Sequence, residues 1–264
     1  MHTRRFGQLA ARTFLAGALL AGVAACGDDD DDAAVDAPAG DGEQAAGGGN
    51  EEFCTALVDF NAMVPQVELD EESTEADMEA AYDQLEPVWA GVRDNAPEDV
   101  QAEIDELDPI IQGLAEGDGE AFNDDETFET YSEMVSKAIP SCDFETASVR
   151  GVDYAFEGIP ETLPAGTVAV EFENASEEEE HEMVVFKKND PDQSTEELFA
   201  LPEEEAMGMI TFAGFAFAPP GGSSSSLLAL EAGSYTVVCF IPVGGEEDGP
   251  PHFTQGMTAE FTVE

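Results

Sequence analysis

The chain has very little positive charge. Its 264 residues include 8 Lys and Arg against 60 Asp and Glu, which gives a formal net charge of -52 at pH 7. Binding to nucleic acid depends on Lys and Arg that neutralise phosphate groups, so this composition excludes a nucleic-acid partner. Charge of one sign also destabilises a folded chain, and salt screens this repulsion. A saline habitat and a generally acidic exported proteome both explain the excess.

The chain also lacks an apolar run long enough to cross a bilayer. Its longest such run, Phe14–Ala25, has about 12 residues, whereas a spanning helix needs about 20. Arg4, Arg5 and Arg12 lie before or near the start of this run. A basic start followed by a short apolar core predicts a signal for export from the cytoplasm.

The stretch Val23–Gly27 (VAACG) ends the apolar run in small residues and a cysteine. It resembles the lipobox of bacterial lipoproteins, in which the cysteine becomes the lipidated first residue. The resemblance implies that residues 1–26 form a lipoprotein signal peptide and that lipid on Cys26 anchors the protein to the extracytoplasmic face of the membrane. A plain secretory signal cleaved near Ala25 is the alternative.

Residues 27–50 (GDDDDDAAVDAPAGDGEQAAGGGN) contain almost no large apolar side chain. A segment of this kind cannot compensate the entropy lost on ordering. We therefore expect a disordered acidic tether between the membrane and the folded part of the chain.

Residues 51–146 carry the apolar spacing of helices. In Thr74–Asn95 apolar residues recur at steps of three and four, and similar stripes at 53–63, 100–114 and 128–138 predict a small bundle of roughly four helices. We expect Pro87 to kink or split the second helix and Pro140 to stop the last one. This part contains no histidine and shows no resemblance to a known family, so we expect a structural or partner-docking role for it.

Cysteine is scarce, with four residues in the chain. If Cys26 carries lipid, Cys54 at the start of the first helix and Cys142 after the last one can meet in an up-down bundle. Outside the cytoplasm these thiols are expected to form a disulfide. Cys239 then remains unpaired, and it is a buried inert residue, a site of pairing between molecules or a metal ligand.

From residue 149 the apolar pattern changes to a period of two, with turn residues at short intervals. The pattern predicts an all-β Greek-key sandwich over residues 149–264, so that the expected fold class is a helical bundle followed by a β-sandwich. The predicted strands are at 152–156, 168–172, 182–187, 208–217, 227–230, 234–240 and 257–264, with a short helix at 194–201 and a flexible loop at 221–226.

Three residues with soft or borderline donor atoms lie close together in the last part of the chain. Cys239 ends one strand on its inward face, and Met257 begins the next on its inward face, so both lie at one pole of the sandwich. His252 belongs to the connection between them, and His181 is the other histidine beyond the signal segment. A thiolate, two imidazoles and a thioether are the ligands of a blue-copper site.

Residues 149–264 resemble the cupredoxin family of blue or type 1 copper proteins, such as plastocyanin and azurin. The resemblance is carried by Asn174, His181–Val185 (HEMVV), Gly233–Tyr235 (GSY), Cys239, His252 and Gly256–Met257. It implies one copper ion with His181, Cys239 and His252 as trigonal ligands and Met257 as the long axial ligand. The implied role is single-electron transfer, not enzymatic catalysis.

Two features depart from the family pattern or modify it. The connection from Cys239 to His252 contains residues 240–251, whereas the family usually has only a few residues there. This acidic segment either bulges outward and leaves the ligands in place, or moves His252 away. The run Glu177–Glu182 (EEEEHE) surrounds His181 with negative charge, which is expected to disfavour anionic partners and lower the reduction potential.

The sequence thus predicts a membrane-tethered extracytoplasmic protein, monomeric, that binds copper and exchanges electrons with a basic-faced redox protein. Two alternatives stay open. One is a metal-free cupredoxin-like binding module or a copper-capture protein. The other is a structural protein of the cell envelope whose helical part docks a partner.

Overall fold

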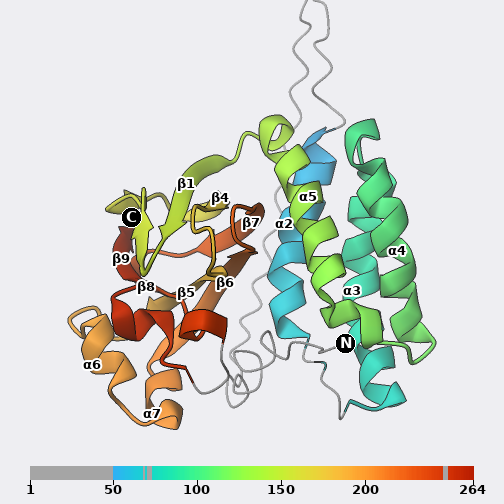
Figure 1. The fold of residues 1–264 in the computed structure, drawn as a ribbon. Helices are drawn as coiled ribbons and strands as arrows, with labels where there is room; N and C mark the ends of the chain where they lie inside the picture. The colour runs from blue at the N-terminus through green and yellow to red at the C-terminus, as the bar shows by residue number, and fades with distance from the viewer. Residues whose placement is uncertain (1–49, 68, 70–72, 246–248) are drawn as a thin grey trace, which may run out of the picture.

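The computed structural model describes residues 50–67, 69, 73–245 and 249–264. The predicted signal peptide with Cys26, and residues 27–49 of the predicted tether, lie outside these ranges. The described chain forms an α-helical part and a β-sandwich that lie side by side (Figure 1). The predicted fold class is therefore confirmed. Over the residues that were described, no helix combines the length and the apolar character that crossing a membrane requires.

Four α-helices of the described chain make up the helical part: α2 (Asn50–Met63), α3 (Glu75–Asn95), α4 (Gln101–Ala115) and α5 (Asp125–Cys142). Each buries one apolar stripe, as in α3, where Ala81, Leu85, Trp89 and Val92 are buried at helical spacing. Thr74 begins α3 with a capping box, because its hydroxyl accepts from Asp77 N–H and the Asp77 carboxylate accepts from Thr74 N–H.

The predicted split of the second helix at Pro87 and the predicted stop of the last helix at Pro140 were wrong. Helix α3 continues through Pro87 as one helix, and α5 continues past Pro140 to Cys142. Both prolines, and Pro109 inside α4, are exposed. The carbonyl group that loses its partner at each proline is therefore on the solvent side of the helix, while buried neighbours such as Trp89 keep the helix packed against the bundle.

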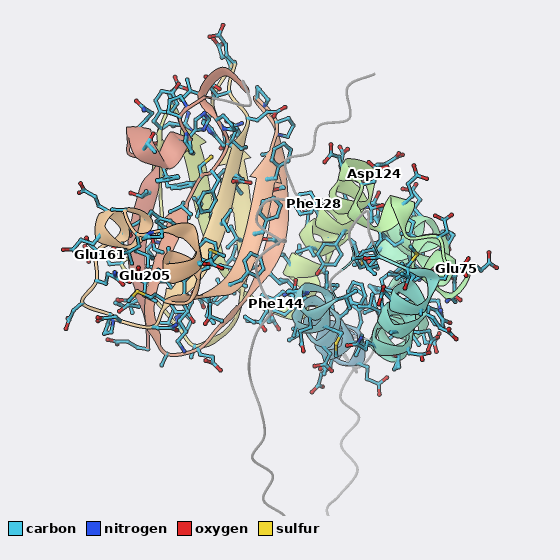
Figure 2. All side chains as sticks on the ribbon, turned by 90° about the horizontal axis from the view of Figure 1, so that it is seen from below. Glu75, Asp124, Phe128, Phe144, Glu161 and Glu205 are labelled. Carbon is cyan, nitrogen blue, oxygen red and sulfur yellow. A yellow bond between two sulfur atoms is a disulfide. The ribbon has the colours of Figure 1, made fainter. Side chains whose placement is uncertain are left out.

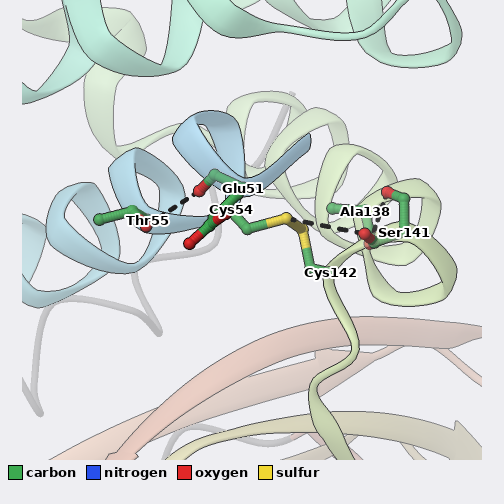
Figure 3. Close-up of a disulfide and its surroundings, with 6 residues drawn as sticks. All are labelled: Glu51, Cys54, Thr55, Ala138, Ser141 and Cys142. Atoms are coloured by element: carbon green, nitrogen blue, oxygen red, sulfur yellow. Dashed lines mark hydrogen bonds between the residues drawn. A yellow bond between two sulfur atoms is a disulfide. The ribbon is translucent and has the colours of Figure 1, made fainter. Parts of the chain in front are cut away.

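Cys54 and Cys142 form the disulfide that was predicted, with a sequence separation of 88 residues and a Cα–Cα distance of 5.4 Å. Figure 3 shows the bond between the first turns of α2 and the last turn of α5. All four helices of the bundle lie within or at the ends of the loop that this bond closes. The disulfide therefore ties the beginning of the bundle to its end, directly before the first strand.

The β-sandwich consists of two sheets in the described chain. One has the strand order β2-β1-β4-β7, and the other has the order β3-β9-β8-β5-β6. Strand β1 pairs with β4, and β3 with β9, in parallel; the remaining pairs are antiparallel. The strands are β1 (Glu145–Val152), β2 (Ala155–Glu157), β3 (Thr162–Leu163), β4 (Gly166–Asn174), β5 (His181–Lys188), β6 (Ile210–Ala218), β7 (Ser223–Leu230), β8 (Gly233–Val238) and β9 (Thr258–Val263).

Strand β5 is buried on both faces, which explains its unbroken apolar run. Met183 and Val185 face the core between the sheets, with Tyr235, Val237 and Phe261 from the neighbouring strands. Val184 and Phe186 face the other way, into a second apolar cluster under two short helices, α6 (Thr195–Phe199) and α7 (Glu203–Met207). Because strand side chains alternate, His181 shares the inward face of Met183 and Val185.

Two local expectations in the sandwich were wrong. The expected strand at 152–156 is a hairpin, in which β1 and β2 pair across a turn at Asp153 and Tyr154. The expected flexible loop at 221–226 includes the first residues of β7, where Ser224, Ser225 and Ser226 are buried. Serine is common in loops, but here strand pairing with β4 and the helices beside β7 decide the structure.

The helices cover the outer edge of β7, the last strand of its sheet. Ser225 N–H donates to Ser132 Oγ of α5 (2.7 Å), and Asn61 Nδ2 of α2 donates to the Leu227 carbonyl (3.1 Å). The Leu227 side chain packs into the core of the helical bundle, and Phe128 meets Phe215 of β6 edge to face. Figure 2 shows Phe128 between the two parts, whereas Glu75, Asp124, Glu161 and Glu205 point outward. The Ser225 N–H and the Leu227 carbonyl, at the edge of this sheet, thus find hydrogen-bond partners in the helices.

Replacing Ser132 with Ala is expected to lower the free energy of unfolding by about 1–3 kcal/mol, because it leaves the buried Ser225 N–H without an acceptor. Ser141→Ala is the matched control in the same helix, since the Ser141 hydroxyl only donates to the Ala138 carbonyl of its own turn. Its effect is expected to stay within about 0.5 kcal/mol. Urea unfolding measures both, and equal effects would contradict the role given to Ser132.

Candidate metal centre

Four residues with metal-binding side chains meet at one pole of the sandwich. His181 begins β5, Cys239 follows β8, His252 begins the short 3₁₀ helix η5 (His252–Gln255), and Met257 directly precedes β9. All four side chains are buried, with exposures of 0%. Side chains alternate along a strand, so Cys239 lies on the same face as Tyr235 and Val237. Met257 likewise lies on the same face as Phe261 and Val263. These four residues belong to the core between the sheets, so Cys239 and Met257 also point inward.

The ligand atoms of three of these residues form one group. Nδ1 of His181 lies 3.2 Å from Nδ1 of His252, and Sγ of Cys239 lies 3.4 Å from the same His252 nitrogen. Each of the three residues offers an atom within 4.8 Å of the others. Met257 belongs to the same apolar cluster as Cys239 and is joined to it by backbone, because Cys239 N–H donates to the Met257 carbonyl (3.3 Å).

The described ends of the long connection between Cys239 and His252, residues 240–245 and 249–251, keep the ligands together. His252 N–H donates to the Ile241 carbonyl (2.9 Å), and Phe253 N–H donates to the Cys239 carbonyl (2.9 Å). Pro242 and Pro251 form a bridge across the base of the connection. The two ends of the connection therefore lie side by side. His252 is thus held beside Cys239 despite the length of the connection.

A tight turn leads from His252 to Met257. Met257 N–H donates to the His252 carbonyl (3.1 Å), and Gly256 N–H donates to the Phe253 carbonyl (3.1 Å). Gly256 has a φ of 109°, a conformation that side chains with a Cβ rarely adopt. The turn therefore fixes the backbone of Met257 relative to that of His252.

Burial sets the protonation of the three ligands. It lowers the pKa of His181 to about 4, with repulsion from His252 as a second cause, and it also lowers the pKa of His252, against the attraction of Glu179. Both rings are therefore neutral at pH 7. Burial raises the pKa of the Cys239 thiol to about 12, although Glu182 N–H points at the sulfur from 3.5 Å. An unliganded thiol here is protonated and poorly reactive.

The donor set fits one copper ion. It is a type 1 copper-like cluster of two imidazoles, a thiol and a thioether, the combination that selects copper. Atoms bonded to a common ion at about 2.0–2.3 Å lie about 3.3–3.8 Å apart, and the observed 3.2 and 3.4 Å are close to this range. The two Nδ1 atoms and the sulfur face one another, whereas Nε2 of both rings is buried and makes no hydrogen bond of good geometry.

Three further residues shape the site and were missed in the sequence. Gly151 lies under His181, and a Cβ there would come within 3.3 Å of the ring. Tyr154, in the turn between β1 and β2 with a φ of 62°, packs its ring edge to face on His252 at 5.0 Å. Glu179 Oε2 lies 3.5 Å from His252 Nε2. Only the run of glutamates in EEEEHE gave a signal, and it did not single out Glu179.

The predicted ligands thus lie together, and the predicted disulfide cysteines lie elsewhere. Cys54 and Cys142 are in the disulfide of the helical part. Cys26, the predicted lipidation site, is outside the described residues. Cys239 is the free cysteine of the described chain.

No protein-family model matches the chain, and no curated protein matches it either. Among solved structures, the chain is similar to reduced auracyanin from the photosynthetic bacterium Roseiflexus castenholzii, with 23% identity, 45% of this chain and 96% of that chain covered, and a TM-score of 0.33. It is also similar to auracyanin A, described as a "blue" copper protein, from Chloroflexus aurantiacus (20% identity, 45% and 98% covered, TM-score 0.29). A third is rusticyanin from Thiobacillus ferrooxidans (19% identity, 45% and 76% covered, TM-score 0.31).

Proposed function

We propose that this protein is a single-electron carrier of the cupredoxin type, with one copper ion held by His181, Cys239, His252 and Met257. The observation that carries the proposal is the buried group formed by the Cys239 sulfur and the two Nδ1 atoms. When bound, the copper would supply a one-electron couple. The protein's own residues would hold the donor atoms in place and exclude water.

The surroundings of the group favour electron transfer over catalysis or capture of the metal. All four side chains are inaccessible to solvent, so no open position is left for a substrate. Backbone hydrogen bonds at Cys239, His252 and Met257 fix three of the ligands from within the fold. Ligands that are held in place move little between the two oxidation states of the copper, so the reorganisation energy of electron transfer stays small. Capture and release of an ion would instead need a ligand that can move.

The charge of the chain points to the kind of redox partner. Exposed carboxylates of Asp153, Glu177 and Glu178 lie in the turn and loop that flank the site. A partner with a basic face would be steered toward this end of the sandwich, and the rate of association would fall as salt is added. Lipid on Cys26 would tether the carrier to the extracytoplasmic face of the membrane; this part of the proposal rests on the sequence alone.

Titration of the metal-free protein with Cu(II) tests the proposal. We expect one equivalent to bind and to produce an intense visible thiolate-to-copper band that disappears on reduction and returns on oxidation. Tight binding of Cu(I) without such a band would instead support copper capture. Absence of stoichiometric metal would leave the structural alternative.

A further inference from the structure

Glu179 is the carboxylate that meets the outer edge of the metal site. Its Oε2 atom lies 3.5 Å from Nε2 of His252, which is an electrostatic contact without the geometry of a hydrogen bond. The His252 ring is fully buried, and this nitrogen makes no hydrogen bond within the described chain. Nδ1 of the same ring faces the Cys239 sulfur. One ring nitrogen is thus directed at the metal site and the other at Glu179.

The backbone of Glu179 is fixed on both sides of the residue. Its carbonyl accepts from the buried Asn174 side chain (2.9 Å), whose Nδ2 also donates to the Ala218 carbonyl. Its N–H donates to Ser176 Oγ (3.0 Å), and Ser176 is itself buried. The loop before β5 therefore presents Glu179 from a fixed position, as a positioning group requires.

The carboxylate of Glu179 joins three segments of the chain. Gly244 N–H, from the long connection before His252, donates to both of its oxygens (3.1 and 3.0 Å). The hydroxyl of Tyr154 donates to Oε1 (3.4 Å), and the Tyr154 ring packs on His252. Only 18% of the Glu179 side chain is exposed. It thus connects Gly244, the β1–β2 turn and the imidazole.

We propose that Glu179 is a positioning residue that orients His252 and stabilises the more positive, oxidised state of the site. A carboxylate at the outer nitrogen favours a proton on Nε2, which leaves Nδ1 free to bind metal. Its negative charge lies in a poorly solvated region, where it acts more strongly than the exposed carboxylates nearby. The effect on the reduction potential rests on the proposed copper site, whereas the effect on the ring does not.

The first test compares Glu179→Gln with Glu178→Gln in the copper-loaded protein. Both remove one charge from adjacent residues, but Glu178 is exposed and only Glu179 contacts His252. We expect Glu179→Gln to weaken Cu(II) binding relative to Cu(I) by about tenfold, which corresponds to a rise of about 59 mV in the reduction potential. Glu178→Gln is expected to change the ratio less than about twofold. Equal shifts would show that Glu179 is one more surface charge and overturn the proposal.

The second test uses the metal-free protein and separates this inference from the proposed function. Nitrogen-15 NMR reports the tautomer of His252, and we expect the Nε2–H form in the unmodified protein. In Glu179→Ala the population with the proton on Nδ1 should rise about tenfold, because the negative charge that favours a proton on Nε2 is lost. An unchanged tautomer would overturn the positioning role. Failure of the protein to bind copper, with the tautomer shifted as expected, would refute only the electron-carrier proposal.

Discussion

Replacement of Cys239 with Ser is expected to abolish the intense visible band of the copper-loaded protein and to weaken copper binding by at least about 100-fold. Loss of a residue that only supports a metal ligand costs about 10–100-fold in metal affinity. Cys239 is itself a proposed ligand and supplies the soft thiolate that selects copper, so we expect its loss to cost at least as much. Serine cannot ionise at neutral pH, so its oxygen is a poor substitute. The fold should survive, because serine is smaller than cysteine and its hydroxyl can donate to His252 Nδ1 where the thiol lies now.

Met257→Leu is the control for this prediction. Leucine has nearly the volume of methionine, so the buried position stays filled. A long axial thioether is a weak ligand, and we expect the band to remain, with the reduction potential shifted. Absorption titration and competition with a chelator of known affinity measure both variants. An unchanged band in Cys239→Ser would contradict the ligand set.

Removal of the disulfide, in Cys54→Ala with Cys142→Ala, is expected to lower the free energy of unfolding by about 4–5 kcal/mol. The bond closes a loop with a separation of 88 residues, and in the chain-entropy model a loop of this size restricts the unfolded chain by that amount. The four helices lie within this loop or at its ends, so the bundle should lose most of the stability. Trp89, the single tryptophan of the chain, is buried in the bundle and reports its unfolding in urea.

Cys239→Ala is the control for the disulfide variant, measured without metal. It removes a cysteine but leaves the Cys54–Cys142 bond intact, and the residue lies in the sandwich, away from Trp89. We expect the transition followed by Trp89 to change by about 1 kcal/mol or less. If opening the disulfide has no larger effect than this control, the loop does not restrict the unfolded chain as the model requires.

Several features of the protein follow from the sequence because they depend on local patterns. Apolar spacing separates the helical part from the sandwich, and strand alternation turns Cys239 and Met257 inward at the same pole. The scarcity of histidine leaves His181 and His252 as the imidazole candidates beyond the signal segment. Cysteine counting singles out Cys54 and Cys142 for the disulfide, which the structure contains.

Other features depend on contacts between segments far apart in the chain. Closure of the connection at Pro242 and Pro251 decides that His252 stays beside Cys239, and composition leaves this open. Pairing with β4 and contact with α5 turn a run of serines into the strand β7.

The same distinction applies to the surroundings of the metal site. One glutamate among four consecutive ones contacts His252, because the Asn174 and Ser176 side chains fix the loop that carries it. Periodicity in a sequence reports which face of an element is buried. The identity of the neighbour across that face depends on how the elements pack, and only the tertiary structure decides it.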